Sequence, residues 1–471
     1  MKRLMVVVFA AALLLAGQGV FDVTHTSALQ AAGASKVYDP GQPGPYAVGF
    51  TSYVLTDTNR SGGVDFPAGR PIPVSVWYPV DPSTITPSTP SAVYPLDPLY
   101  GLVEDAHSSD FEVYGIDPAY QEPPASGARP FPLVIFSPGW GAPVFAHNSI
   151  GTRLASHGFV VAVMFHYGDW WWEWEPFDHI ALASWNRPRD VSFTLTDLLA
   201  RNQTPGDVLY GAIRPEQIAA SGWSLGGYAS MALTGGDDNV CDFFAEDPFL
   251  LEWMGPPPPE TCTPSVPDPR IKAIVPLDGS NQILKFAELV RVTVPAMGIG
   301  EEWEMLALDP DPAWASWQAR QHAAFSGRPA YRVDVYNSIH QSFADVCEFG
   351  QVLGDLGIWD QAFVDLWLSW SCEGVIPSAE AHRLTTKYMI AFLKTELVRE
   401  AGYQHILTPG YALTGEPNIE FFITEKRNPP AISEEWPDTF IYFMHQSGSA
   451  QAKAEKDPTA TLPVHRALPK Q

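Results

Sequence analysis

The feature that most restricts the fold is the stretch Ile218-Ala-Ala-Ser-Gly-Trp-Ser-Leu-Gly-Gly-Tyr-Ala-Ser230. It begins as an apolar, strand-like run, turns sharply around Ser224, and continues in residues that suit a helix. This is the G-x-S-x-G pattern in a strand, turn and helix context, which holds a serine above the end of a sheet. Glycines on either side leave room for the crowded backbone, and the helix directs free N–H groups at the turn. We therefore interpret Ser224 as a nucleophile; the alternative is a structural turn serine.

The rest of the chain supplies strands and helices in the order that such a turn needs. Near-continuous apolar runs are typical of buried parallel strands, and periodic apolar residues between them indicate helices. Besides the run before Ser224, the expected strands are 46–55, 72–78, 132–137, 159–165, 271–277, 292–299 and, last, 331–336. The expected helices include 146–157, 186–201 with Asn186 as its cap, and 378–401. We predict an α/β protein of the α/β-hydrolase fold, with a mostly parallel central sheet flanked by helices.

The chain is expected to form one domain, residues 35–445, between an export signal and a disordered tail, 446–471. Residues 1–34 have the pattern of a signal peptide, because Lys2 and Arg3 precede a short apolar run and Ala32-Gly-Ala34 resembles a cleavage site. We therefore expect a secreted or periplasmic protein without a stable membrane anchor. Cap-like insertions are expected at 79–129, which we interpret as irregular and superficial, and at 167–185, 235–268 and 345–377.

Net charge and cysteine content restrict the partners and cofactors that the protein can have. The 471 residues carry a formal charge of −25, which disfavours nucleic acid as a partner. Four cysteines allow three pairings, and in an exported protein they indicate disulfides rather than a metal site. We favour Cys241–Cys262 and Cys347–Cys372 because each pair closes one local insertion. No metal or other cofactor is expected, since no cysteine or histidine spacing supports zinc.

A serine needs a base to take its proton and an acid to orient that base. In the α/β-hydrolase order both follow the serine, on loops after later strands. His340 follows the run 331–336 and is the favoured base, because His322 and His382 lie in segments that we interpret as helical. Asp278 ends a buried strand and is the favoured acid. Glu301, Glu302 and Glu304 follow the next strand and are the alternative.

Two further groups complete the candidate site. The oxyanion that forms on the attacked carbonyl needs N–H donors, for which we favour the backbone of Leu225 and of Trp140. The second group is a loop that carries four tryptophans beside the same sheet edge. These are Trp170, Trp171, Trp172 and Trp174. They form either an exposed substrate-binding surface, together with Trp223, or a packed cap over the insertion 235–268.

Five segments together resemble the plasma-type platelet-activating-factor acetylhydrolase family. They are Phe136-Ser-Pro-Gly-Trp-Gly141, Leu154-Ala-Ser-His-Gly-Phe-Val-Val-Ala162, Gly222-Trp-Ser-Leu-Gly-Gly227, Pro276-Leu-Asp278 and Ser338-Ile-His-Gln-Ser-Phe-Ala-Asp345. The last segment is the most specific, whereas the first three also occur in cutinase-like polyester hydrolases and dienelactone-hydrolase-like esterases. The resemblance covers roughly 46–397, apart from the insertions.

The resemblance implies a calcium-independent serine esterase with Ser224, Asp278 and His340 as its triad and Trp140 and Leu225 as oxyanion donors. Polyester hydrolases place the acid one strand later, so Asp278 favours the acetylhydrolase branch. The chain departs from that branch at Ser137-Pro138, where His-Gly is usual, at Trp223, which replaces the common elbow histidine, and in its additional insertions.

We therefore expect a secreted carboxylic-ester hydrolase that acts through an acyl-enzyme on short-chain or oxidised acyl esters, including those of phospholipid type. Its partner is a small ester or lipid substrate. One alternative is a polyester hydrolase with the tryptophan loop on the polymer. The other is a catalytically silent hydrolase fold that serves only in binding.

Overall fold

The computed structural model describes residues 37–168, 179–246, 251–252, 254–301 and 317–424. Several sequence predictions fall outside these residues. They concern the signal peptide, the tail, Trp170, Trp171, Trp172, Trp174, Glu302 and Glu304. In the part of the chain that is described, no helix is both long and apolar enough to cross a bilayer.

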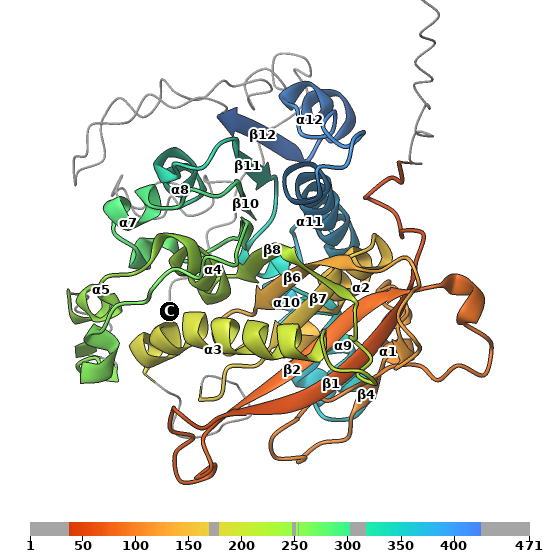
Figure 1. Cartoon of the computed structure of the whole chain (residues 1–471), viewed down its shortest axis with the longest axis horizontal. Helices are drawn as coiled ribbons and strands as arrows, with labels where there is room; N and C mark the ends of the chain where they lie inside the picture. The colour runs from red at the N-terminus through yellow and green to blue at the C-terminus, as the bar shows by residue number, and fades with distance from the viewer. Residues whose placement is uncertain (1–36, 169–178, 247–250, 253, 302–316, 425–471) are drawn as a thin grey trace, which may run out of the picture. The chain divides into compact units, whose positions relative to one another are not determined.

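Ten of the described strands form one sheet in the order β12-β11-β10-β9-β8-β6-β7-β2-β1-β5 (Figure 1). The strands of this sheet are β1 (Ala47–Asp57), β2 (Arg70–Val80), β5 (Tyr120–Gln121), β6 (Phe131–Ser137), β7 (Val160–Met164), β8 (Ile213–Trp223), β9 (Ala273–Leu277), β10 (Ala296–Glu301), β11 (Ala330–Val335) and β12 (Ile419–Thr424). Strands β7, β6, β8, β9, β10 and β11 are mutually parallel. The predicted antiparallel start is confirmed, since β1 pairs with β2 over their whole length.

Helices cover both faces of this sheet. The helices are α1 (Ser108–Glu112), α2 (Asn148–Ser156), α3 (Ile180–Arg201), α4 (Leu225–Gly235), α5 (Val240–Glu246), α7 (Phe286–Val290), α8 (Trp317–Ala324), α9 (Val346–Asp355), α10 (Gln361–Ser371), α11 (Ser378–Phe392) and α12 (Pro409–Gly415). Alternate residues of β6 point to opposite faces: Leu133 and Ile135 pack with α3 and α4, whereas Val134 and Phe136 pack with α2 and α11. Both faces of β6 are therefore core, which explains why this strand is an uninterrupted apolar run.

The structure corrects three predictions about the elements. Helix α3 begins at Ile180, with the His179 side chain as its cap, so Asn186 lies inside the helix and not at its start. Residues 331–336 are not the last strand, because β12 pairs antiparallel with β11. The insertion 79–129 is less superficial than predicted, since it contributes buried side chains such as Tyr94 and Phe111 to the core. It also forms a small ribbon of β3 (Val93–Tyr94) and β4 (Ala106–His107).

Both predicted disulfides are confirmed. Cys241 bonds to Cys262 and closes the insertion that carries α5. Cys347 bonds to Cys372 and ties the start of α9 to the end of α10. Each disulfide thus closes one local insertion, as the short sequence separations of 21 and 25 residues suggested.

Candidate active site

Ser224 lies at the turn between β8 and α4, in a backbone conformation that side-chain-bearing residues rarely adopt. Its φ is 56° and its ψ is −121°. Such a conformation costs about 1–3 kcal/mol and persists only where its surroundings hold it. Here the Ser224 N–H donates to Leu277 O at 3.0 Å, and Ser224 O accepts from the Ser280 N–H at 3.0 Å. Strand β9 and the loop after it therefore hold the strained turn in place.

Glycines let the loop after β6 and the serine turn approach each other closely. A Cβ at Gly226 would lie 1.8 Å from Ser137 O, and one at Gly222 would lie 2.4 Å from the Gly226 carbonyl carbon. A Cβ at Gly139 would lie 2.6 Å from the Trp223 ring and 3.3 Å from Ser224 Cβ. The loop after β6 is consequently pressed against the serine turn, at the carboxyl ends of β6 and β8.

Asp278 and His340 meet at the same sheet edge. Asp278 directly follows β9, and its Oδ2 is hydrogen-bonded to Nδ1 of His340. His340 follows β11, at the start of a short 3₁₀ turn, His340–Phe343. The Asp278 side chain is 4 % exposed and that of His340 31 %, so the aspartate is buried behind a histidine that reaches solvent. An acceptor on Nδ1 places the proton there and leaves Nε2 as the basic nitrogen.

Trp223 joins the histidine to the serine turn. Its indole N–H donates to the backbone carbonyl of His340 at 2.9 Å. Its ring also packs on the His340 imidazole, with centroids 4.8 Å apart. Within the described residues, the Ser224 hydroxyl makes no hydrogen bond with His340, and the Trp223 indole links the two segments through its hydrogen bond and its ring contact. Catalytic hydrogen bonds are often long before substrate binds.

Asp278, the acid favoured from the sequence, is hydrogen-bonded to His340. Glu301 lies buried at the end of β10, one strand further along the sheet. A residue that the sequence did not single out supports Asp278: Gln318 Nε2 donates to its Oδ1 at 3.3 Å. Gln318 lies on α8, in a helix without a recognisable motif, so no sequence pattern pointed to it.

The two predicted oxyanion donors belong to the segment that follows Ser224 and to the loop after β6. Leu225 is the first residue of α4, where backbone N–H groups have no acceptor within the helix. Trp140 lies in the loop after β6, next to the Gly139 that contacts the serine turn. The two candidate donors therefore belong to two segments that meet at the serine turn.

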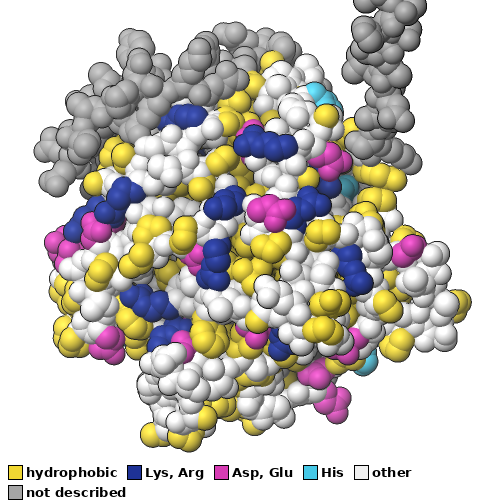
Figure 2. Space-filling view, viewed as in Figure 1, with side chains coloured by type: hydrophobic (Ala, Val, Ile, Leu, Met, Phe, Trp, Pro, Cys, Tyr) yellow, Lys and Arg dark blue, Asp and Glu magenta, His cyan; other side chains and the backbone are white. Residues whose placement is uncertain are grey.

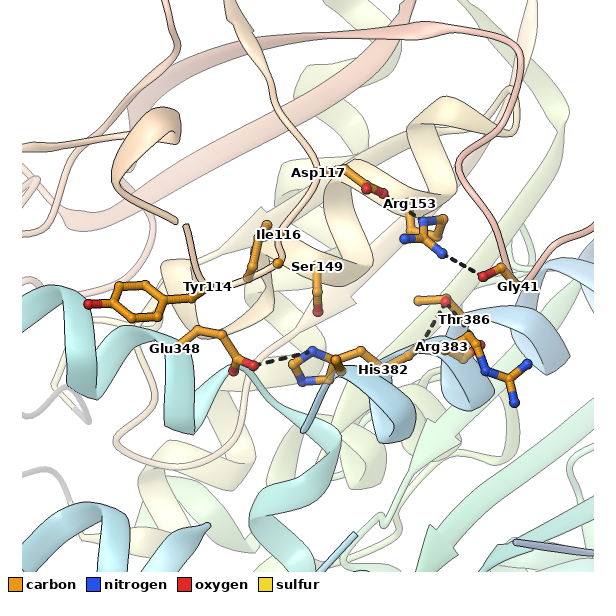
Figure 3. A pocket seen from close by; sticks show the side chains of 12 residues that line it. Gly41, Tyr114, Ile116, Asp117, Ser149, Arg153, Glu348, His382, Arg383 and Thr386 are labelled. Atoms are coloured by element: carbon orange, nitrogen blue, oxygen red, sulfur yellow. Dashed lines mark hydrogen bonds and ion pairs between the residues drawn. The ribbon is translucent and has the colours of Figure 1, made fainter. Parts of the chain in front are cut away.

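A second polar cluster lies between α2, α9 and α11 (Figure 3). It lines a cavity of 190 Å³ that does not include the triad candidates. The His382 imidazole lies between two carboxylates: Nε2 is 3.4 Å from Asp345 Oδ1, and Nδ1 is 3.9 Å from Glu348 Oε1. Each imidazole nitrogen thus faces a different carboxylate, and the three side chains form one cluster of titratable groups. Asp345 also accepts from the Ser149 N–H at 2.8 Å and so fixes the start of α2.

The fold and this geometry define the class: a protein of the α/β-hydrolase fold, with a serine turn, a histidine and an aspartate at the carboxyl ends of its strands. The predicted resemblance is confirmed by a family model described as platelet-activating factor acetylhydrolase, isoform II, which matches residues 113–169. A curated relative, platelet-activating factor acetylhydrolase of Cavia porcellus, is 32% identical over 138 residues. That match covers 27% of this chain and only 28% of the relative.

A solved structure shares the fold over most of its length. This is a ferulic acid esterase from Streptomyces cinnamoneus, with a TM-score of 0.51 and 20% sequence identity. The superposition covers 80% of this chain and 96% of that one. At this level of identity the likeness concerns the fold.

Proposed function

We propose that this protein is a serine carboxylic-ester hydrolase. The observation that carries the proposal is the convergence at one sheet edge of the strained Ser224 turn and the hydrogen-bonded Asp278–His340 pair. The partial match to platelet-activating factor acetylhydrolase supports the same chemistry. Backbone strain of this kind clusters at active sites, which favours a catalytic protein over a silent binding fold.

In the proposed reaction, Ser224 Oγ attacks the ester carbonyl while His340 Nε2 takes its proton. Asp278 holds the imidazole and stabilises the imidazolium that forms. The N–H groups of Leu225 and Trp140 bind the oxyanion. The tetrahedral intermediate then collapses, the alcohol leaves with the proton from His340, and an acyl-enzyme remains. Water activated by the same histidine hydrolyses that ester and restores Ser224.

We further propose that the substrates are short-chain or oxidised acyl esters of lipid type and that the protein acts outside the cytoplasm. Asp278 directly follows β9, as the acetylhydrolase pattern implies, whereas the polyester-hydrolase pattern would use a glutamate after β10. Two disulfides are compatible with an oxidising compartment. A panel of esters graded by acyl length would define the chain-length preference.

The proposal is tested by Ser224→Ala. We expect turnover of p-nitrophenyl acetate and butyrate to fall by about 10⁴-fold or more, because the nucleophile is lost while binding remains. Thermal unfolding should change little, and Ser221→Ala, three residues earlier in β8, serves as the matched control. Turnover by Ser224→Ala at the wild-type rate would overturn the proposal.

A further inference from the structure

A buried network lies beneath the loop after β6. Arg187, on α3, is completely buried. Its guanidinium donates to Pro138 O, to Gly139 O at 2.9 Å and to Ser137 Oγ at 3.1 Å. One buried cation thus donates to three consecutive residues of the loop that contains the candidate oxyanion donor.

The network continues away from the loop as a chain of hydrogen bonds. Ser137 Oγ is 2.8 Å from Nε2 of His166, whose Nδ1 is 2.9 Å from Asp190 Oδ2. Burial, together with Arg187, lowers the pKa of His166 to about 3, so this imidazole is neutral at physiological pH. Its Nδ1 then donates to Asp190, and its Nε2 accepts from the Ser137 hydroxyl. Ser137, His166 and Asp190 thus form a Ser–His–Asp chain of hydrogen bonds. Ser137 is buried, however, and its Oγ accepts from Arg187, so we interpret this chain as structural.

Asp190 anchors the far end of the chain. It accepts from Arg70 at 3.0 Å and is ion-paired with Arg60 at 2.6 Å. Burial alone would raise the pKa of Asp190, but the two guanidinium groups hold it well below its usual range. The carboxylate is therefore ionised, and the network between Asp190 and Arg187 is polarised along its length.

We infer that Arg187 is a positioning residue for the oxyanion hole and that it aims and polarises the Trp140 N–H. The Gly139–Trp140 peptide is trans, so its C=O and N–H point in opposite directions. The Gly139 carbonyl accepts from Arg187 at 2.9 Å and from the Ala142 N–H at 3.1 Å, so the Trp140 N–H points away from these two donors, and Gly139 itself contacts the Ser224 turn. A cation on the carbonyl also strengthens the N–H of the same peptide as a donor.

This inference rests on the proposed function and is tested with Arg187→Met. We expect kcat for p-nitrophenyl butyrate to fall about 10- to 100-fold, less than the loss of a direct donor, while KM changes less than about threefold. The affinity for an aryl boronic acid, which forms a tetrahedral adduct with the serine, should fall by the same factor as kcat/KM. Rates are expressed per active site, titrated to completion with a fluorophosphonate.

Arg189→Met is the matched control. Arg189 lies on the same helix, but it donates to Trp185 O and Pro264 O, away from the loop after β6. We expect its kcat and boronate affinity to equal those of wild type. If Arg187→Met does not fold, Arg187→Gln, which keeps a donor but loses the charge, carries the test with the same expectation.

The outcomes separate the inference from the proposed function. Wild-type kcat and boronate affinity in the Arg187 variant, a loss confined to KM, or an equal loss in Arg189→Met would overturn the inference alone. Absence of esterase turnover in the wild-type protein would instead overturn the proposed function.

Discussion

At the scale of single residues, the position of Asp278 distinguishes two patterns within the same fold. The acetylhydrolase pattern has the triad acid directly after β9, whereas the polyester-hydrolase pattern has it one strand later. Asp278 adopts a positive φ of 41°, receives a hydrogen bond from Gln318 and contacts His340. The alternative acids were Glu301, Glu302 and Glu304. Of these the structure describes Glu301, which lies at the end of β10, one strand further along the sheet than Asp278. Asp278 is therefore the acid that we propose, a choice that the sequence left open because both carboxylates follow a buried strand.

Asp278→Asn tests that assignment. An asparagine amide would favour the wrong tautomer of His340, so we expect kcat for p-nitrophenyl butyrate to fall by about 10⁴-fold at pH 7. Glu301→Gln is the comparison and should retain kcat within about threefold. The reverse pattern, with activity lost in Glu301→Gln and kept in Asp278→Asn, would move the acid to the glutamate position.

At the scale of elements, the sequence predicted best where one physical signal dominates. Buried parallel strands are continuous apolar runs, and β6 and β9 lie close to their predicted bounds. The start of α3 was misplaced because Asn186 is a favourable cap residue, yet the helix begins at Ile180 and continues through both Asn186 and Pro188. Strand β12 has a β-branched and aromatic signal, Ile419-Glu-Phe-Phe-Ile-Thr424, but follows the long helix after which no further strand was expected.

The cluster of Asp345, Glu348 and His382, between α2, α9 and α11, makes the stability of the fold depend on pH. Burial, together with Glu348, raises the pKa of Asp345 to about 7. Burial alone would lower the pKa of His382, but Glu348 and Asp345 raise it above its ordinary value. Both groups bind protons more tightly in the folded state, so their contribution to stability is present at low pH and is lost as the pH rises through about 7.

We therefore expect the free energy of unfolding to fall by about 1 kcal/mol or more between pH 6 and pH 8.5, measured by urea denaturation. Glu348→Gln removes a carboxylate that raises both pKa values and should flatten this dependence. Glu373→Gln, which removes an exposed carboxylate, should leave it unchanged. A profile that rises across this range, or one that Glu348→Gln does not alter, would contradict the interpretation.

At the scale of the whole molecule, the sequence predicted the fold and the three residues proposed for the triad because strand order determines which loops share a sheet edge. It did not reveal Gln318, Arg187 or His166, since buried partners that come from separate elements leave no local pattern.

The formal charge of −25 gathers in no single patch on the face drawn in Figure 2, where acidic and basic side chains are interspersed.

The central claim is that one serine, Ser224, is the activated nucleophile. The chain also holds Ser137 in a buried Ser–His–Asp sequence of hydrogen bonds, which provides an internal comparison. The most direct measurement is mass spectrometry of peptides after reaction with a fluorophosphonate. We predict one adduct per chain, on Ser224, which is absent in Ser224→Ala. No adduct, or an adduct on Ser137 or another serine that persists in Ser224→Ala, would contradict the account.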